Sequence, residues 1–324
     1  MNQLEAIAVI NRYSQEKIPF LFMVNYETSH SRIIPISEIN PDEILFYVNG
    51  FTNAAHLNDC NRVALNQFTK KPIAFSDYKE SYNKVMHHLL RGDSYLTNLT
   101  CTTPIECNLT LRDIFLQSEA KYRLYVKDEF VVFSPEIFIQ IKEGTIYSFP
   151  MKGTIDAQLE NAEYEILTNK KESAEHATIV DLIRNDLSKV ATNVKVEKYR
   201  YIDVIKTNEG KLLQVSSKIS GILDNQYRQQ LGNIIFQLLP AGSISGAPKE
   251  KTLEIIASAE THKRGFYTGV FGVFDGKDID SGVLIRFIEK QQEQLVFKSG
   301  GGITANSSLE SEYQEMIQKV YLPF

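Results

Sequence analysis

The chain has 324 residues, enough for two small domains or for one large α/β or α+β domain. Apolar residues make up 43% and charged residues 23%, which is typical of a globular protein and excludes a disordered, collagen-like or coiled-coil chain. The net charge of −5 gives no general attraction to phosphate backbones, so we expect no nucleic-acid partner.

Targeting and redox signals are weak in this sequence. No apolar run approaches the roughly 18 residues of a membrane helix, and the first residues show no signal peptide. The cysteines Cys60, Cys101 and Cys107 are too few and too scattered for a disulfide framework, and no Cys-x-x-Cys pair supports a zinc site. We therefore expect a protein of the reducing cytoplasm that is not in a membrane.

The predicted elements alternate irregularly along the chain. Residues 1–75 are predicted to form short strands, for example at 19–26 and 44–50, and a helix over 77–91 ends at Gly92. A strongly amphipathic helix is predicted over 173–190. Further strands are predicted at 94–103, 121–126, 129–133, 145–149, 211–220, 267–275, 279–288 and 294–298, and further helices at 227–239, 249–260 and 308–320. This order favours an α+β fold with large antiparallel sheets, and no linker divides residues 1–324.

Two glycine-rich segments each lie just before a predicted helix. Residues 242–246 lead into the helix at 249–260, and residues 300–302 precede the last helix. Glycines allow sharp turns and expose backbone N–H groups, and a helix N-terminus favours an anion. The residues alone leave two interpretations open: a plain turn or bulge, and a site for an anionic ligand such as a carboxylate.

Several ionisable residues stand out by their positions. Glu312, Glu315 and Lys319 share one face of the last predicted helix, either as solvated pairs or as part of a site. Glu175 points partly inward, where it is a partner for the helix dipole or, with Glu315, a ligand for Mg²⁺. Lys152 has apolar and small neighbours, and it is either a solvated turn residue or a buried amine whose lowered pKa makes it a nucleophile.

Taken together, these segments resemble the chorismate-utilising enzymes, a family that includes anthranilate synthase component I, aminodeoxychorismate synthase component I, isochorismate synthase and salicylate synthase. The resemblance covers residues 75–324 and is carried by motifs at 92–99, 134–136, 150–154, 175–187, 242–249, 264–269, 285–286, 300–303 and 312–315. It implies a single α+β domain of two antiparallel sheets with helices packed outside and chorismate bound between the sheets.

The resemblance also implies roles for individual residues. Glu175 and Glu315 would bind Mg²⁺, which holds the ring carboxylate of chorismate beside Lys319. Glu136 would be the general acid that protonates the departing 4-hydroxyl, and Lys152 would be the nucleophile that attacks C2. The remaining substrate-binding residues would be Arg286, Tyr267, Ser243, Gly246 and the backbone N–H groups of Gly300, Gly301 and Gly302.

Three positions distinguish the members of the family. Lys152 resembles the lysine of aminodeoxychorismate synthases, whereas anthranilate synthases usually have Ala there. Leu96 stands where isochorismate and salicylate synthases have a lysine base, and where most amino-adding members have Gln. Gln214 replaces a His that supports pyruvate elimination in anthranilate synthases. We expect amination of chorismate at C4 to 4-amino-4-deoxychorismate, for p-aminobenzoate and folate; anthranilate synthase component I and a non-catalytic chorismate-binding protein are the alternatives.

The source of ammonia lies outside this chain. No cysteine stands in a Gly-x-Cys-x-Gly setting, so the chain has no nucleophile for glutamine hydrolysis. We therefore expect a glutamine amidotransferase subunit as a partner. Longer members of the family carry an N-terminal region that helps to build a tryptophan site. The signature of that region is missing from this sequence, so we also expect no feedback by tryptophan.

Overall fold

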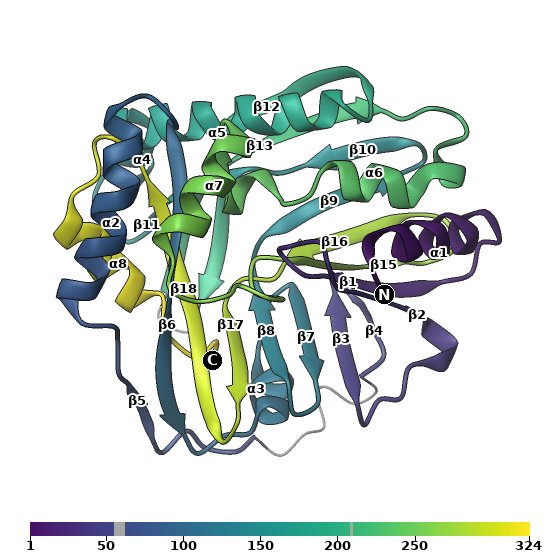
Figure 1. The fold of residues 1–324 in the computed structure, drawn as a ribbon, viewed down its shortest axis with the longest axis horizontal. Coiled ribbons are helices and arrows are strands. Elements are labelled where there is room, and N and C mark those ends of the chain that lie inside the picture. The colour runs from purple at the N-terminus through teal and green to yellow at the C-terminus, as the bar shows by residue number, and fades with distance from the viewer. Residues whose placement is uncertain (55–61, 208–209) are drawn as a thin grey trace.

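The computed structural model describes residues 1–54, 62–207 and 210–324, and within them two nine-stranded antiparallel sheets lie next to each other (Figure 1). The first sheet has the order β11 (Met151–Asp156), β13 (Gly210–Ile222), β10 (Thr145–Ser148), β9 (Ile137–Lys142), β16 (Ile279–Val283), β15 (Val270–Phe274), β1 (Phe20–Val24) and β2 (Ser31–Pro35), and β12 (Thr192–Thr207) pairs with β13. The second has the order β14 (Gly246–Ala247), β6 (Leu96–Cys107), β18 (Gln294–Ile303), β17 (Phe287–Gln291), β8 (Phe130–Ser134), β7 (Tyr122–Val126), β3 (Ile44–Val48) and β4 (Phe51–Thr52), and β5 (Phe68–Lys70) pairs with β6.

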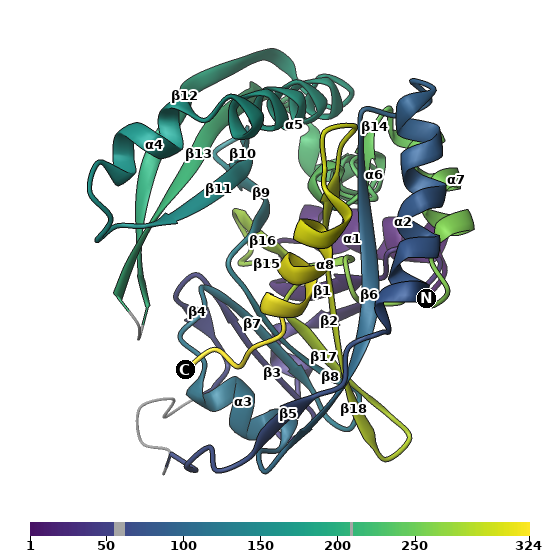
Figure 2. The same ribbon diagram turned by 90° about the vertical axis from the view of Figure 1, so that its left-hand side faces the viewer.

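Helices pack around both sheets (Figure 2). On the first sheet the helices are α1 (Gln3–Gln15), α6 (Leu231–Gln237), α4 (Ala162–Thr168) and α5 (Lys170–Ser188), the last two at the end formed by β11 and β13. On the second sheet they are α2 (Phe75–Leu90), α7 (Lys249–Ala259), α8 (Leu309–Gln318) and α3 (Leu111–Gln117). Short 3-10 helices lie at η1 (Ile36–Glu38), η2 (Tyr227–Gln230) and η3 (Gly242–Ile244). No described helix has both the length and the apolar run needed to span a bilayer. The predicted α+β class, with two antiparallel sheets and helices outside them, is confirmed.

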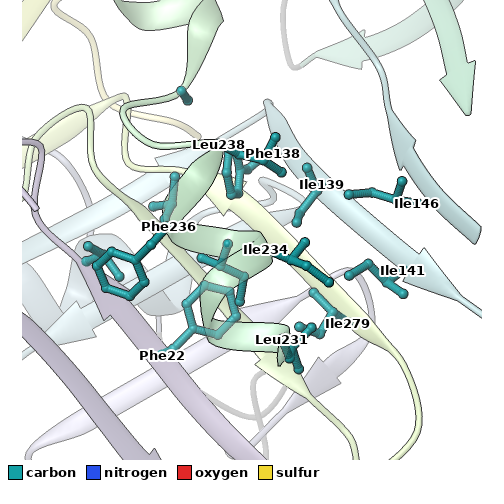
Figure 3. Packing of buried hydrophobic residues seen from close by; sticks show 14 of the residues in the cluster. Phe22, Phe138, Ile139, Ile141, Ile146, Leu231, Ile234, Phe236, Leu238 and Ile279 are labelled. Carbon is teal, nitrogen blue, oxygen red and sulfur yellow. The ribbon is translucent and has the colours of Figure 1, made fainter. Parts of the chain in front are cut away.

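Strand β1 shows how the layers are held together. All five of its residues are buried, because successive side chains point to opposite faces and both faces are covered. Leu21 and Met23 join Phe46 in the core between the two sheets. Phe22 packs on the other face in a cluster with Leu231 of α6 (Figure 3). Each such apolar side chain contributes roughly 1.5–3 kcal/mol when fully buried.

The N-terminal region differs from the prediction. Residues 3–15 form α1, whereas the sequence analysis assigned only strands before residue 75. A capping box starts the helix: Asn2 Oδ1 accepts from the Glu5 N–H at 3.0 Å, and Glu5 Oε2 accepts from the Asn2 N–H at 3.0 Å. Only Ala6, Ile10 and Ser14 are buried, so the apolar face of α1 is narrow and its periodicity is easily missed. The strands predicted at 19–26 and 44–50 are confirmed as β1 and β3.

Other elements also differ from the prediction. The predicted strand at 279–288 is two strands, β16 and β17, because Arg286 has φ +53° and turns the chain between them. The predicted loop at 300–302 is part of β18, where a Cβ added at Gly300 would lie only 2.3 Å from the Leu99 carbonyl oxygen. The elements α3, β9, β11 and β12 were not predicted. Cys101 and Cys107 are free thiols, and Cys60 lies outside the described residues.

Candidate active site

A bulge in β11 brings Lys152 into the site. The register with β13 shifts between Met151 and Thr154, and Gly153 has φ +82°, which favours glycine. From this bulge the Lys152 side chain reaches α5, where Nζ lies 2.8 Å from Glu175 Oε2. The side chain of Glu175 is 6% exposed and that of Lys152 is 22% exposed, so water screens this ion pair only weakly.

The charge of Lys152 follows from this ion pair. Burial lowers the pKa of Lys152, but the Glu175 carboxylate, with Glu172 and Glu315 beyond it, outweighs burial and raises the pKa. The direction is opposite to the lowered pKa that the sequence analysis expected from apolar packing. In the chain by itself, Lys152 is therefore an ammonium whose lone pair is not available for attack.

Strand β18 runs between Lys152 and helix α8. A Cβ added at Gly302 would lie 4.0 Å from Lys152 Nζ and 2.9 Å from Leu96 Cδ1. A Cβ added at Gly301 would lie 3.5 Å from Glu315 Oε1. Among the described strands, β17 pairs with β18 only over 294–298, so the edge of β18 next to the glycines has no partner strand on that side. Binding of a ligand by the backbone N–H groups of the glycines at 300–302 stays a prediction.

Helix α8 supplies a second ion pair. Glu315 Oε1 lies 2.6 Å from Lys319 Nζ, which also donates a hydrogen bond to the Gly300 carbonyl oxygen at 2.9 Å. Burial lowers the pKa of Lys319; Glu315 opposes this shift, and the positive charges of Arg286 and Lys152 add to it. The lysines and glutamates that the sequence singled out are thus within electrostatic reach of one another.

Glu136, directly after β8, has the properties of a general acid. Its backbone N–H donates to Ser134 Oγ at 3.1 Å, and Ser243 Oγ of η3 donates a hydrogen bond to Glu136 Oε1. Burial raises the pKa of Glu136, while Ser243, Arg286 and Lys319 each pull it down without cancelling the rise. A carboxyl group with a raised pKa holds its proton to higher pH, as an acid catalyst requires.

Arg286 lies within electrostatic reach of Glu136, and Tyr267 lies within electrostatic reach of Arg286. Tyr267 is buried, and its ring centroid is 5.8 Å from that of Phe287. Burial raises the pKa of Tyr267, so its hydroxyl stays protonated and can donate a hydrogen bond. The positive charge of Arg286 lowers the pKa of both Tyr267 and Glu136 without cancelling the effect of burial on either.

The segment at 242–246 has a structural role in addition to its predicted binding role. Gly246 has φ +146°, and a Cβ there would lie 1.8 Å from the Leu96 carbonyl oxygen. Its glycine is therefore explained by close packing of β14 on β6. Since the Ser243 hydroxyl binds Glu136, the structure places Ser243 beside the acid; direct contact of Ser243 and Gly246 with substrate stays a prediction.

The carboxylates fit a magnesium ion in chemistry and number. Magnesium prefers oxygen ligands and is usually bound by one or two carboxylates with water and substrate oxygens. No group of three or more His, Cys, Asp or Glu side chains that could hold a metal ion occurs among the described residues, so water and substrate oxygens would have to supply most ligands of a Mg²⁺ ion at Glu175 and Glu315. Each carboxylate is paired with a lysine here, which shows that a positive charge is favourable at both positions. Binding of Mg²⁺ to these residues stays a prediction.

Two further buried residues lie near the site: Glu312, which the sequence analysis placed on one helix face with Glu315 and Lys319, and His176, which it did not single out. Glu312 is 5% exposed and accepts a hydrogen bond from Ser307 Oγ at 2.6 Å. His176 is 1% exposed, and its Nε2 lies 2.7 Å from Ser217 Oγ. Burial lowers the pKa of His176 to about 4, so the imidazole is neutral at physiological pH. Its hydrogen bond to Ser217 connects the helix that carries Glu175 with β13. The position of His176 directly after Glu175 was the feature of the sequence that could have identified it.

Comparison with known proteins agrees with this geometry. The family model described as chorismate binding enzyme matches residues 21–323, and the chain belongs to this family. An uncharacterized PabA-like protein of Haemophilus influenzae is 50% identical, over 97% of this chain and 94% of that protein. Aminodeoxychorismate synthase component 1 of Bacillus subtilis is 29% identical over 77% of this chain, which corresponds to 55% of that longer protein.

Solved structures show the same fold. The menaquinone-specific isochorismate synthase MenF of Escherichia coli has a TM-score of 0.76 at 14% identity and covers 98% of this chain and 81% of its own. The anthranilate synthase component I of Streptococcus pneumoniae has a TM-score of 0.66 at 27% identity and covers 81% of this chain and 60% of its own. The chain therefore has the fold of solved members of this family, and the names of those members record different reactions.

Proposed function

We propose that this chain is the chorismate-aminating component I of an aminodeoxychorismate synthase. One observation carries the proposal: Lys152, held by Glu175 and beside the Gly302 backbone, presents a primary amine inside the candidate active site. The name of the Bacillus subtilis relative supports the same reaction class. The product would be 4-amino-4-deoxychorismate, an intermediate for p-aminobenzoate and folate.

The proposed chemistry uses Lys152 and Glu136 in turn. Neutral Lys152 Nζ forms a bond to C2 of chorismate, the two ring double bonds shift, and the C4–O bond breaks. Glu136 donates its proton to the departing oxygen, which leaves as water. Ammonia then bonds to C4, the double bonds shift back, and the C2–Nζ bond breaks to release Lys152. Proton transfer from the added ammonia restores the charges.

Glu175 and Glu315 would hold Mg²⁺ in this scheme. When bound, Mg²⁺ would supply positive charge for the ring carboxylate and would compete with Lys152 for Glu175. Arg286 and the backbone N–H groups of residues 300–302 would bind the enolpyruvyl carboxylate. Ammonia would come from a glutamine amidotransferase subunit, because no cysteine of this sequence stands in a Gly-x-Cys-x-Gly setting.

The test is identification of the product. The purified chain is incubated with chorismate, MgCl₂ and an ammonium salt at alkaline pH. The products are then separated and identified by mass spectrometry. We expect 4-amino-4-deoxychorismate, and no product when glutamine replaces ammonium. Anthranilate as the main product would contradict the proposal and favour anthranilate synthase component I.

A second measurement examines the covalent step directly. With chorismate and MgCl₂ but without ammonia, the intact mass of the quenched protein should increase by the mass of chorismate less water. Lys152→Ala should show no increase, and so should Lys152→Arg, because a guanidinium stays protonated. Binding without turnover or adduct in the wild-type chain would identify it as a chorismate-binding protein.

A further inference from the structure

We propose that Tyr321, in the segment after α8, is a positioning residue that holds Arg286 toward the substrate. The proposal rests on the proposed function, in which Arg286 binds a carboxylate of chorismate. It adds a residue outside every motif of the family resemblance. Arg286 itself sits in a backbone conformation that non-glycine residues rarely adopt, with φ +53°, and such positions occur at ligand sites.

Two direct contacts connect Tyr321 with Arg286, and Phe133 contacts both residues. Arg286 Nε donates a hydrogen bond to Tyr321 Oη at 3.1 Å, and Arg286 Cζ lies 5.6 Å from the tyrosine ring centroid. The ring also contacts Phe133, with centroids 6.2 Å apart and planes at 64°. The Phe133 backbone N–H in turn donates to the Arg286 carbonyl oxygen at 3.2 Å. The side chain and the backbone of Arg286 are therefore fixed from the same side.

The segment that carries Tyr321 is itself anchored. Val320 is 1% exposed and Leu322 is 9% exposed, and both belong to the core cluster under the second sheet. Lys70 Nζ donates to the carbonyl oxygens of Ile317 at 2.8 Å and Val320 at 3.2 Å. Because successive side chains of an extended segment point to opposite sides, burial of residues 320 and 322 directs Tyr321 away from that core. The backbone that carries Tyr321 is thus anchored, and the tyrosine ring, which is 42% exposed, rests against Phe133.

This support leaves the binding end of Arg286 available. Nε is used by Tyr321, whereas within the described part of the chain Nη1 and Nη2 of Arg286 have no hydrogen-bond partner. These two groups form the planar fork that binds a carboxylate through two parallel hydrogen bonds. A guanidinium already held in one orientation loses less side-chain entropy when the carboxylate binds.

The experiment is a double-mutant cycle on binding. The Kd for chorismate is measured by calorimetry with MgCl₂ present, for the wild type, Tyr321→Phe, Arg286→Lys and the double variant. We expect Tyr321→Phe to raise Kd about five- to ten-fold in the wild-type background, which corresponds to the net contribution of one ordinary hydrogen bond in water. In the Arg286→Lys background the same change should alter Kd less than about two-fold, because a lysine has no Nε–H fork for the tyrosine to hold.

The controls separate the possible outcomes. Tyr164→Phe, on the exposed tyrosine of α4, should leave Kd unchanged, and all variants should keep the wild-type melting temperature. If Tyr321→Phe raises Kd by the same factor in both backgrounds, Tyr321 acts through packing of its segment and the proposal is wrong. A wild-type chain that binds chorismate without aminating it contradicts only the proposed function, because the cycle reads binding and not product.

Discussion

The two lysines of the candidate site are each paired with a glutamate, yet their pKa values shift in opposite directions. Lys152 Nζ lies 2.8 Å from Glu175 on the side of β11 and α5, and Lys319 Nζ lies 2.6 Å from Glu315 on α8. Burial lowers both pKa values, but the net shift is upward for Lys152 and downward for Lys319. The distance to the partner therefore does not decide the direction of the pKa shift of either amine.

The surroundings of each ion pair explain the difference. The side chain of Glu175 is 6% exposed, whereas that of Glu315 is 46% exposed, and water screens the exposed carboxylate more strongly. Lys152 also has Glu172 and Glu315 in reach, while Lys319 has the positive charges of Arg286 and Lys152. The comparison teaches that the charges around each pair set the direction of its pKa shift, so the proposed attack by Lys152 requires that Glu175 be engaged elsewhere.

The largest expected effect comes from removing Lys152, the proposed nucleophile. Lys152→Ala should lower the amination rate about 10³-fold, the size of a lost catalytic group, while chorismate still binds. Lys251→Ala is the matched control, because Lys251 also forms an ion pair with a glutamate, at 2.6 Å from Glu254, but on the exposed surface. Steady-state kinetics measure the rate, and amination at the wild-type rate by Lys152→Ala would exclude the covalent route.

The glycines between the two lysines should respond differently to a methyl group. Gly300→Ala should destabilise the protein by about 1–3 kcal/mol, since a Cβ there overlaps the backbone of β6. Gly301→Ala should leave the melting temperature nearly unchanged but weaken chorismate binding about ten-fold, because its Cβ would fill space next to Glu315 and Lys319. Thermal unfolding and calorimetry test both, and equal destabilisation of the two variants would contradict this division.

Labelling of the lysines tests the opposite pKa shifts directly. Only a neutral amine reacts with acetic anhydride, so reactivity appears as pH rises through the pKa. Because the pKa of Lys319 is lowered and that of Lys152 is raised, Lys319 should be acetylated at lower pH in the metal-free chain. Glu175→Gln should move Lys152 labelling to lower pH. Peptide mass mapping follows both sites, and the reverse order in the wild type would refute the comparison.

The smallest effect is expected at Glu136. The hydrogen bond from Ser243 stabilises the ionised carboxylate and holds down a pKa that burial raises. Ser243→Ala should therefore raise the pKa of Glu136 further, so that the acid stays protonated to higher pH. The fall of the amination rate that accompanies ionisation of Glu136 should move to higher pH; a shift to lower pH would show that Ser243 acts otherwise.

The sequence predicted the parts of the fold that depend on local pattern. The helices that became α5, α7 and α8 have clear apolar periodicity, and the predicted strands at β7, β8 and β15 lie where expected. Helix α1 was missed because only three of its residues are buried, although its capping box was readable from Asn2 and Glu5. The glycines at 300–302 were assigned to a loop because close packing on β6 is a property of two strands far apart in the sequence.

The same distinction between local pattern and tertiary structure holds for the candidate site. Residue types and positions made Lys152, Glu175 and Glu315 candidates, and the resemblance to the chorismate-utilising enzymes assigned their roles and added Glu136. Only the tertiary structure decided their charges and partners: the raised pKa of Lys152, the hydrogen bond from Ser243 to Glu136, and the support of Arg286 by Tyr321. These properties depend on burial and on neighbouring charges that residues remote in sequence provide, and no local pattern records them.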